Sequence, residues 1–164
     1  MSVINYKFRN EVLKHNASLS YCYKCSTCSG GCPVALLTSG NYNPRKIIEE
    51  AILGLQDKLV QSQDPNPWLC STCQKCVELC PQKVELTEIF VLIKNRCFKQ
   101  SKTPEAFLAQ AQAVLENGVA IPYSKAILTR RDKLGLPEVK TASLDEINEL
   151  LQETNFKKHL LKEG

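Results

Sequence analysis

Eight of the nine cysteines in this chain fall into two copies of one pattern. The first copy is Cys22-x2-Cys25-x2-Cys28-x3-Cys32-Pro33 and the second is Cys70-x2-Cys73-x2-Cys76-x3-Cys80-Pro81. The four cysteines and the proline recur at a constant offset of 48 positions, whereas the residues between the cysteines differ. The repeated element is therefore a frame of sulfur ligands and not a copied sequence.

This frame has the spacing that holds cubane iron-sulfur clusters in two-cluster ferredoxins. A cubane offers four iron corners, and three thiolates spaced three residues apart on a tight, partly helical loop can bind three of them. The fourth ligand must come from elsewhere, and in two-cluster ferredoxins it is the cysteine before the proline of the other motif. Proline suits the position after a ligand because its fixed φ and missing N–H favour a sharp exit of the chain.

We therefore predict two [4Fe-4S] clusters with crossed metal ligands and no catalytic residue. The first cluster is expected on Cys22, Cys25, Cys28 and Cys80, and the second on Cys70, Cys73, Cys76 and Cys32.

Two other roles of cysteine fit the frame less well. A structural zinc site usually pairs two Cys-x2-Cys knuckles into a tetrahedron, and the third cysteine of each triplet is surplus to that. Disulfide frameworks are typical of short secreted chains. The segment from Met1 to Lys7 has neither the apolar run nor the cleavage site of a signal peptide. We therefore expect a cytoplasmic protein without native disulfides.

Cys97 lies outside both copies of the pattern. We interpret it as a buried helical thiol, since free cysteine is commonly a small core residue. A ligand or redox role is the alternative.

Length and composition limit the architecture. With 164 residues, 43% of them apolar, the chain can form one ordinary core. We expect a ferredoxin core over residues 1–102 and a helical extension for subunit docking over residues 103–164, both in one compact domain. The longest apolar run, Ile89–Ile93, is far shorter than the roughly 20 residues of a membrane span.

The formal charge of +4 counts every cysteine as a neutral thiol. Two cubanes ligated by thiolates bring the protein near neutrality, so the main support for a nucleic-acid partner disappears. Two basic groups remain, and we interpret both as solvated or partner-facing surfaces: Arg130, Arg131 and Lys133, and Lys157, Lys158 and Lys162.

Apolar residues at helical spacing predict a nearly all-α chain. The expected helices span residues 5–16, 43–55, 84–101, 103–118, 123–133 and 143–151. Asn43 is a good N-cap before Pro44, and Ser143 begins a capping-box pattern. The one strand signal is a short segment at Met1–Ile4. Trp68 is expected to pack beside the second cluster.

Several kinds of site are absent from the sequence. It contains no G-x-G-x-x-G motif and no P-loop, so a dinucleotide or flavin fold of its own is unsupported. The two histidines, His15 and His159, lie far from both motifs and from each other. The eight ligands saturate two clusters, so we expect the chain to move single electrons and to leave bond breaking to another subunit.

The two motifs also carry a family resemblance. At Cys22-Tyr23-Lys24-Cys25-Ser26-Thr27-Cys28-Ser29-Gly30-Gly31-Cys32-Pro33, and again at Trp68-Leu69-Cys70-Ser71-Thr72-Cys73-Gln74-Lys75-Cys76, the chain resembles the small iron-sulfur subunit (the C subunit) of CoB-CoM heterodisulfide reductase, a member of the α-helical ferredoxin group. Asn43-Pro44-Arg45 and Leu134-Gly135-Leu136-Pro137 add to the likeness, which covers most of the chain.

The resemblance implies an α-helical ferredoxin with additional C-terminal helices and two [4Fe-4S] clusters. It also implies relay of electrons from the flavin and iron-sulfur A subunit to the catalytic B subunit. In that family the B subunit binds unusual clusters through Cys-Cys-Gly motifs and reduces the mixed disulfide of coenzyme M and coenzyme B, in methanogenesis. This chain has no adjacent cysteine pair, so the resemblance carries over the eight cluster cysteines and no disulfide-reducing site.

Three alternatives remain open at this point. The chain could serve another oxidoreductase of the sulfur-oxidising, succinate or fumarate, or glycolate type, since these share related double motifs. It could be a free ferredoxin carrier, although a carrier does not need the helices after Thr103. A zinc-stabilised adaptor is the third alternative.

Overall fold

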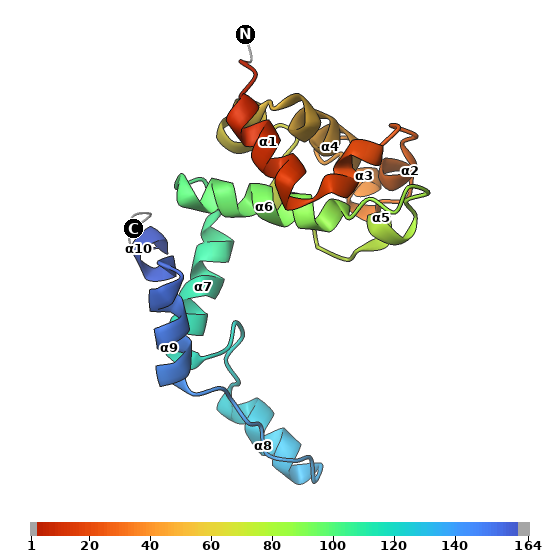
Figure 1. The fold of residues 1–164 in the computed structure, drawn as a ribbon. Coiled ribbons are helices and arrows are strands. Elements are labelled where there is room, and N and C mark those ends of the chain that lie inside the picture. Colours follow the sequence, from red (N-terminus) through yellow and green to blue (C-terminus); the bar gives the residue numbers. More distant parts are fainter. Residues whose placement is uncertain (1–2, 161–164) are drawn as a thin grey trace. The chain divides into compact units, whose positions relative to one another are not determined.

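The computed structural model describes residues 3–160, and its regular elements are all helices, as predicted (Figure 1). Val3 and Ile4 form no strand, so the strand expected at Met1–Ile4 is not found in its described half. Met1 and Ser2 lie outside the described residues. The chain divides into two compact units, Met1–Lys102 and Thr103–Gly164.

The core of the first unit lies between three helices, α1 (Tyr6–His15), α4 (Pro44–Leu53) and α6 (Leu86–Lys99), which pack against one another. Each presents an apolar stripe to the core, and the stripe of α6 is buried throughout: Leu86, Ile89, Phe90, Ile93 and Cys97. Burial of large apolar side chains is the dominant favourable contribution to folding. The largest fully buried side chains are Tyr42, Phe8, Phe90, Leu19, Ile47, Ile48, Leu59, Ile89, Ile93, Val12, Val60 and Val84.

Local hydrogen bonds set the ends of these helices. The side chain of Asn5 accepts the N–H of Phe8 at 2.9 Å, and that of Asn43 accepts the N–H of Lys46 at 3.0 Å, so both residues act as N-caps. Helix α4 ends two residues before the predicted limit because Gly54 has a φ of +76°. A Cβ at Gly54 would also lie 2.8 Å from the backbone oxygen of Asn5, so only glycine fits there.

Short elements carry the cysteine motifs and connect the long helices. They are η1 (Ala17–Tyr21), α2 (Thr27–Gly30), α3 (Pro33–Leu37), the π-helix η2 (Asp57–Ser62), η3 (Pro67–Leu69) and α5 (Lys75–Glu78). The sequence did not predict η2, which packs against α4 and α6 through buried Leu59 and Val60.

Cys97 on α6 is fully buried, as predicted. Its thiol donates to the Leu59 carbonyl at 3.8 Å. Burial raises the pKa of Cys97 to about 11, so the thiol stays protonated at neutral pH.

The second unit contains α7 (Glu105–Asn117), α8 (Lys125–Lys133), α9 (Leu144–Glu153) and α10 (Phe156–Leu160). Gly118, with a φ of +73°, ends α7 as predicted. The Ser143 side chain makes no capping hydrogen bond, so that part of the capping-box prediction is wrong. Helix α10 was not predicted. No side chain of α7, α8 or α9 is fully buried.

None of the helices over residues 3–160 combines the length and apolar character needed to span a bilayer.

Candidate metal centres

The two cysteine loops share an unusual backbone. Lys24 and Ser26 have φ values of +61° and +66°, and Thr72 and Gln74, 48 positions later, have +56° and +61°. A positive φ is uncommon for residues other than glycine. Turns of this kind form the N–H-lined concavities found around many phosphate and iron-sulfur sites. The two loops therefore share a backbone conformation as well as a cysteine spacing, even where their other side chains differ.

The first cavity is open to solvent, has about 320 Å³ of empty space and contains the N-terminal cysteine triplet. Its walls include Lys24, Arg45, Val84 and Leu86. The four cysteines that line it are Cys22, Cys25, Cys28 and Cys80, so the fourth sulfur comes from the other motif.

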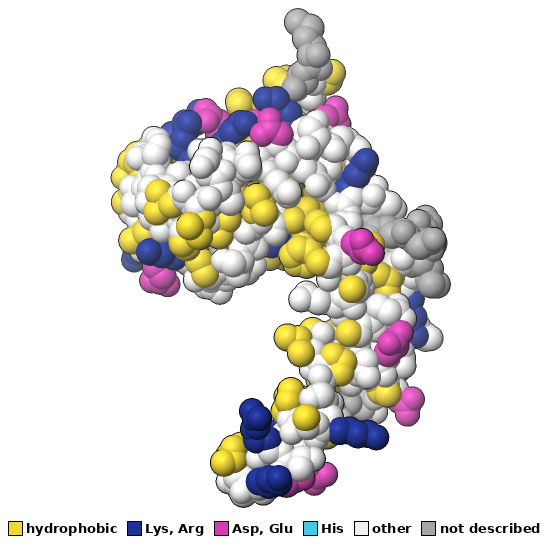
Figure 2. Space-filling view, turned by 180° about the vertical axis from the view of Figure 1, so that it is seen from behind, with side chains coloured by type: hydrophobic (Ala, Val, Ile, Leu, Met, Phe, Trp, Pro, Cys, Tyr) yellow, Lys and Arg dark blue, Asp and Glu magenta, His cyan; other side chains and the backbone are white. Residues whose placement is uncertain are grey.

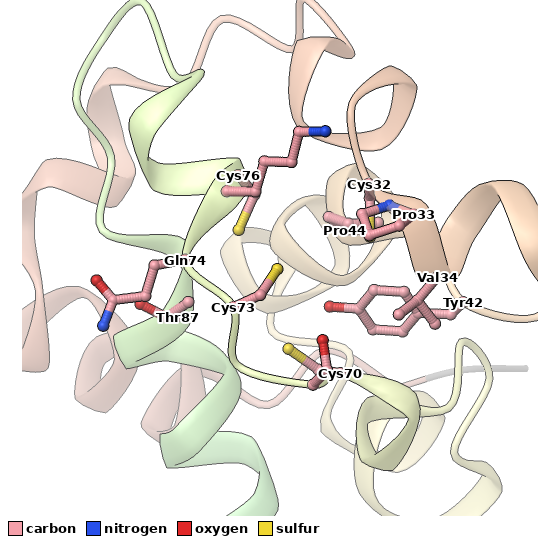
Figure 3. A pocket seen from close by; sticks show the side chains of 12 residues that line it. Cys32, Pro33, Val34, Tyr42, Pro44, Cys70, Cys73, Gln74, Cys76 and Thr87 are labelled. Atoms are coloured by element: carbon pink, nitrogen blue, oxygen red, sulfur yellow. The ribbon is translucent and has the colours of Figure 1, made fainter.

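The second cavity is also open to solvent, has about 300 Å³ of empty space and contains the C-terminal triplet. Figure 3 shows sulfur atoms and the Tyr42 ring around it, with side chains from segments far apart in sequence. The four cysteines that line it are Cys70, Cys73, Cys76 and Cys32. The fold thus gathers the eight predicted ligands into the same two groups of four that the crossed pattern predicts.

Packing between α2 and α5 makes this exchange of cysteines feasible. Gly31 follows α2, and a Cβ at that position would lie 2.3 Å from the side-chain methyl carbon Cδ1 of Leu79, which follows α5. Gly31 and Leu79 are equivalent positions of the two motifs, 48 residues apart. A residue without a side chain meets a large one, so the two loops can approach closely enough for Cys32 and Cys80 to reach the opposite cavities.

The number of cysteines around each cavity fits a multi-iron group. Tetrahedral zinc with bonds of about 2.3 Å needs its sulfurs about 3.8 Å apart. Within residues 3–160 no three His, Cys, Asp or Glu side chains converge enough to hold one metal ion. Four cysteines around one cavity suit a cubane, whose thiolates bind four separate iron atoms.

The cysteine side chains around the cavities differ in solvent exposure. Cys32 and Cys76 are buried, whereas Cys25 and Cys73 are exposed. Burial raises the pKa of Cys76 to about 12, and it also raises the pKa of Cys28. A hydrogen bond to Thr27 lowers the pKa of Cys25, and the backbone N–H of Lys75 lowers that of Cys73. Cys76 therefore needs a bound metal to lose its proton at neutral pH.

Several sulfur atoms have hydrogen-bond partners. Cys80 Sγ accepts the N–H of Val84 at 3.3 Å, and Cys70 Sγ accepts the N–H of Thr72 at 3.4 Å. Cys25 Sγ and the Thr27 hydroxyl lie 3.2 Å apart. Such bonds stabilise thiolates and tune the potentials of iron-sulfur clusters.

Charged side chains beside the two cavities are arranged differently. Next to the first cavity, Glu49 pairs with Lys24 at 2.9 Å and with Arg45 at 3.1 Å. Next to the second cavity, Lys94 Nζ donates to the Cys70 carbonyl at 2.8 Å and lies 6.0 Å from the centre of the Trp68 ring. The partly buried Trp68 packs against the core, as expected from its sequence position.

Sequence reasoning missed Tyr42, Glu49 and Lys94 as neighbours of the motifs. Tyr42 has a weak signal, since an apolar residue just before an N-cap commonly packs on the helix that follows. Glu49 and Lys94 have none, because only tertiary packing brings them to the loops.

Comparison with known proteins agrees with this geometry. Residues 18–84, which include all eight cysteines of the two motifs, match the 4Fe-4S dicluster domain family. The C subunit of the H(2):CoB-CoM heterodisulfide,ferredoxin reductase of Methanothermobacter marburgensis is 33% identical over 85% of this chain and 76% of its own length. A second relative, the iron-sulfur C subunit 2 of the CoB--CoM heterodisulfide reductase of Methanocaldococcus jannaschii, is 33% identical over 94% of this chain and 89% of its own length.

The chain belongs to the C-subunit family of heterodisulfide reductase. The family extends to a heterodisulfide reductase C-subunit-like protein of Archaeoglobus profundus, 30% identical over 84% of this chain and 74% of its own length. As a member of this family with a 4Fe-4S dicluster domain, the chain is an iron-sulfur electron-transfer subunit of a multi-subunit oxidoreductase. The predicted family resemblance and the mainly helical fold are confirmed.

Proposed function

We propose that the chain binds two [4Fe-4S] clusters with crossed ligands. Cys22, Cys25, Cys28 and Cys80 hold the first, and Cys70, Cys73, Cys76 and Cys32 hold the second. The observation that carries this proposal is the grouping of the eight cysteines, four around each cavity, with one member of each group donated by the other motif. When bound, such a cluster takes up or releases one electron at a time.

The relay runs between two partners. The flavin and iron-sulfur A subunit supplies the electrons, and the Cys-Cys-Gly B subunit uses them to reduce the CoM-S-S-CoB heterodisulfide. The relatives named after heterodisulfide reductase support this assignment. The exposed cysteines, Cys25 and Cys73, mark where each cavity comes nearest to a partner. A reducing cytoplasm, where thiols stay free for metal binding, suits this role.

Residues 103–164 serve as the docking extension. Helix α8 and the turn after it expose Ile127, Leu128, Leu134 and Leu136, with exposed fractions between 41% and 68%. Figure 2 shows hydrophobic and basic side chains next to each other on this part of the chain, at the bottom of the view. Apolar side chains that the unit itself leaves exposed are suited to burial against another protein of the complex.

Anaerobic purification of the native complex tests the proposal. We expect about eight iron atoms per chain, since each cubane contains about four, and two reducible EPR signals. We also expect a flavoprotein and a Cys-Cys-Gly protein to copurify. Bound zinc, or less than half of this iron, would contradict the cluster assignment. A stable monomer in fresh lysate would instead favour a free electron carrier.

A further inference from the structure

Tyr42 is a buried phenol beside the second cavity. It is 1% exposed, whereas Tyr6, Tyr21, Tyr23 and Tyr123 are between 46% and 65% exposed. Its ring meets Phe90 of α6 edge to face, with the ring centres 6.2 Å apart and the planes at 77°. This contact fixes the direction of the phenol, because edge-to-face pairs favour a defined ring geometry.

The hydroxyl of Tyr42 lies on the cavity side of the ring. In Figure 3 it points toward the sulfur atoms of Cys70 and Cys73. Burial is the largest cause of the raised pKa of Tyr42, followed by its contact with Cys70. A phenol carries its proton at neutral pH, so the hydroxyl can donate a hydrogen bond to a thiolate.

The first cavity has no corresponding buried donor among its lining residues. Val84 and Leu86 line it, and no tyrosine does. Lys24 and Arg45, which also line it, pair with Glu49. The Thr27 hydroxyl lies 3.2 Å from the sulfur of the exposed Cys25. Water competes for a hydrogen bond at an exposed sulfur, whereas a bond in a water-poor interior is electrostatically stronger.

We propose that the Tyr42 hydroxyl raises the reduction potential of the second cluster above that of the first. An electron shared between the two centres then resides mainly on the one held by Cys70, Cys73, Cys76 and Cys32. This inference rests on the proposed function.

The physical basis is charge. Uptake of one electron makes the thiolate-ligated centre more negative by one unit, without making or breaking a bond, and the proton stays on the Tyr42 oxygen. A donor aimed at the Cys70 sulfur stabilises the more negative form more than the less negative one. The partner that accepts electrons should therefore bind beside the second cavity, and the partner that supplies them beside the first.

The test is an EPR-monitored redox titration of the anaerobically purified complex with Tyr42→Phe. This variant removes the hydroxyl and keeps the ring on Phe90. We expect the equilibrium preference of the second cluster for the electron to fall about tenfold, which corresponds to a shift of about 59 mV for one electron. The first cluster should keep its potential and serves as the internal reference. Cys73→Ser and Cys25→Ser, which alter one signal each, identify the two signals.

Two controls separate the hydroxyl from packing. Tyr23→Phe removes an exposed hydroxyl between Cys22 and Cys25 and should leave both potentials unchanged. Phe90→Leu disturbs the Tyr42 ring contact and should lower the unfolding midpoint more than Tyr42→Phe does.

Fluorotyrosine incorporation covers the case in which Tyr42→Phe loses its iron. The fluorinated phenol is a stronger acid and a stronger donor, and Tyr42 is the only buried tyrosine among the five. The potential of the second cluster should rise. Two clusters with potentials that respond to neither change would overturn the role of Tyr42 and leave the proposed function standing, whereas a protein without clusters would overturn the proposed function itself.

Discussion

The two cavities have the same ligand frame and different surroundings. Both loops use left-handed residues at equivalent positions, a short helix and a cysteine exchanged with the other loop. The first cavity lies beside an ionic cluster of Lys24, Glu49 and Arg45. The second lies beside the buried Tyr42. The frame therefore determines which metal group can bind, and the surroundings determine how the two groups differ.

Removal of the fourth ligand of one cluster should distinguish the two cavities most strongly. Cys32→Ala removes a cysteine of the first motif, but we expect it to empty the second cavity, and Cys80→Ala should empty the first. Each variant should lose iron from that cavity alone and keep about four irons, those of the other cubane, because an iron corner without its thiolate is weakly held. Iron analysis with EPR identification of the surviving signal measures this result.

Cys97→Ala is the matched control, since it removes a buried cysteine that lines neither cavity. Its iron content should be unchanged, although the protein should be less stable because a cavity replaces the thiol. If Cys32→Ala removed the signal that Cys25→Ser alters, the ligands would not be crossed.

The sequence predicted the long helices well because each combines an apolar stripe with a strong end signal. Asn43 and Gly118 are examples at an N-terminus and a C-terminus. It missed η2 because a π-helix follows a different period from an α-helix. It also missed the burial of Glu50, which is 4% exposed and accepts a hydrogen bond from Lys58 Nζ at 3.4 Å. That burial depends on the path of η2, which no local pattern reveals.

The candidate site also has a part that the sequence predicts and a part that it does not. The choice of the eight cysteines follows from their spacing. Their grouping follows from the crossed pattern of two-cluster ferredoxins, because three closely spaced thiols leave one corner of a cubane unbound. Tyr42 and Lys94 reach the second cavity only because α4 and α6 pack together. The difference between the two cavities is thus a tertiary property, and its one local signal in the sequence is the weak one at Tyr42.

Loss of the Asn43 side chain should weaken cluster binding at the first cavity more than at the second. Its Oδ1 accepts the N–H of Lys46 at 3.0 Å and the hydroxyl of Ser29, on α2, at 2.8 Å. Asn43→Ala should therefore cost about 1–2 kcal/mol, through the lost cap and the lost tie to α2. Chemical denaturation measures the cost, and chelator extraction should remove the first cluster faster.

Ser124→Ala provides a matched cap deletion in the second unit, where Ser124 accepts the N–H of Ile127 at 3.3 Å. It should leave both extraction rates unchanged. If Asn43→Ala raised the extraction rates of both clusters equally, the hydrogen bond between Asn43 and Ser29 would not stabilise the first cavity specifically.

A smaller effect is expected where the two loops touch. Gly31→Ala places a methyl group against Leu79, whose flexible end can move aside, so the cost should be about 1 kcal/mol. Adding Leu79→Ala should restore part of that loss. A double-mutant cycle of unfolding free energies measures this coupling. Purely additive effects would show that the contact does not hold the loops together.

The smallest effect concerns the ionic cluster beside the first cavity. Glu49→Gln leaves the positive charges of Lys24 and Arg45 without their shared carboxylate. Two uncompensated cations favour the more negative, reduced form of the first cluster, so its potential should rise toward that of the second. The stability cost should stay below about 1 kcal/mol, because the pairs are partly exposed and screened by salt.

The stability that Glu49 contributes depends on pH in a definite direction. The hydrogen bond from Lys24 lowers the pKa of Glu49 below its ordinary value of 4.5. A carboxylate with a depressed pKa contributes its stability above the ordinary value and loses it only as the pH falls through the lowered one. The stability difference between the natural protein and Glu49→Gln should therefore be constant between about pH 8 and pH 5, and it should shrink with added salt. A difference that varied across this range would mean that another group beside the first cavity, and not Glu49, balances Lys24 and Arg45.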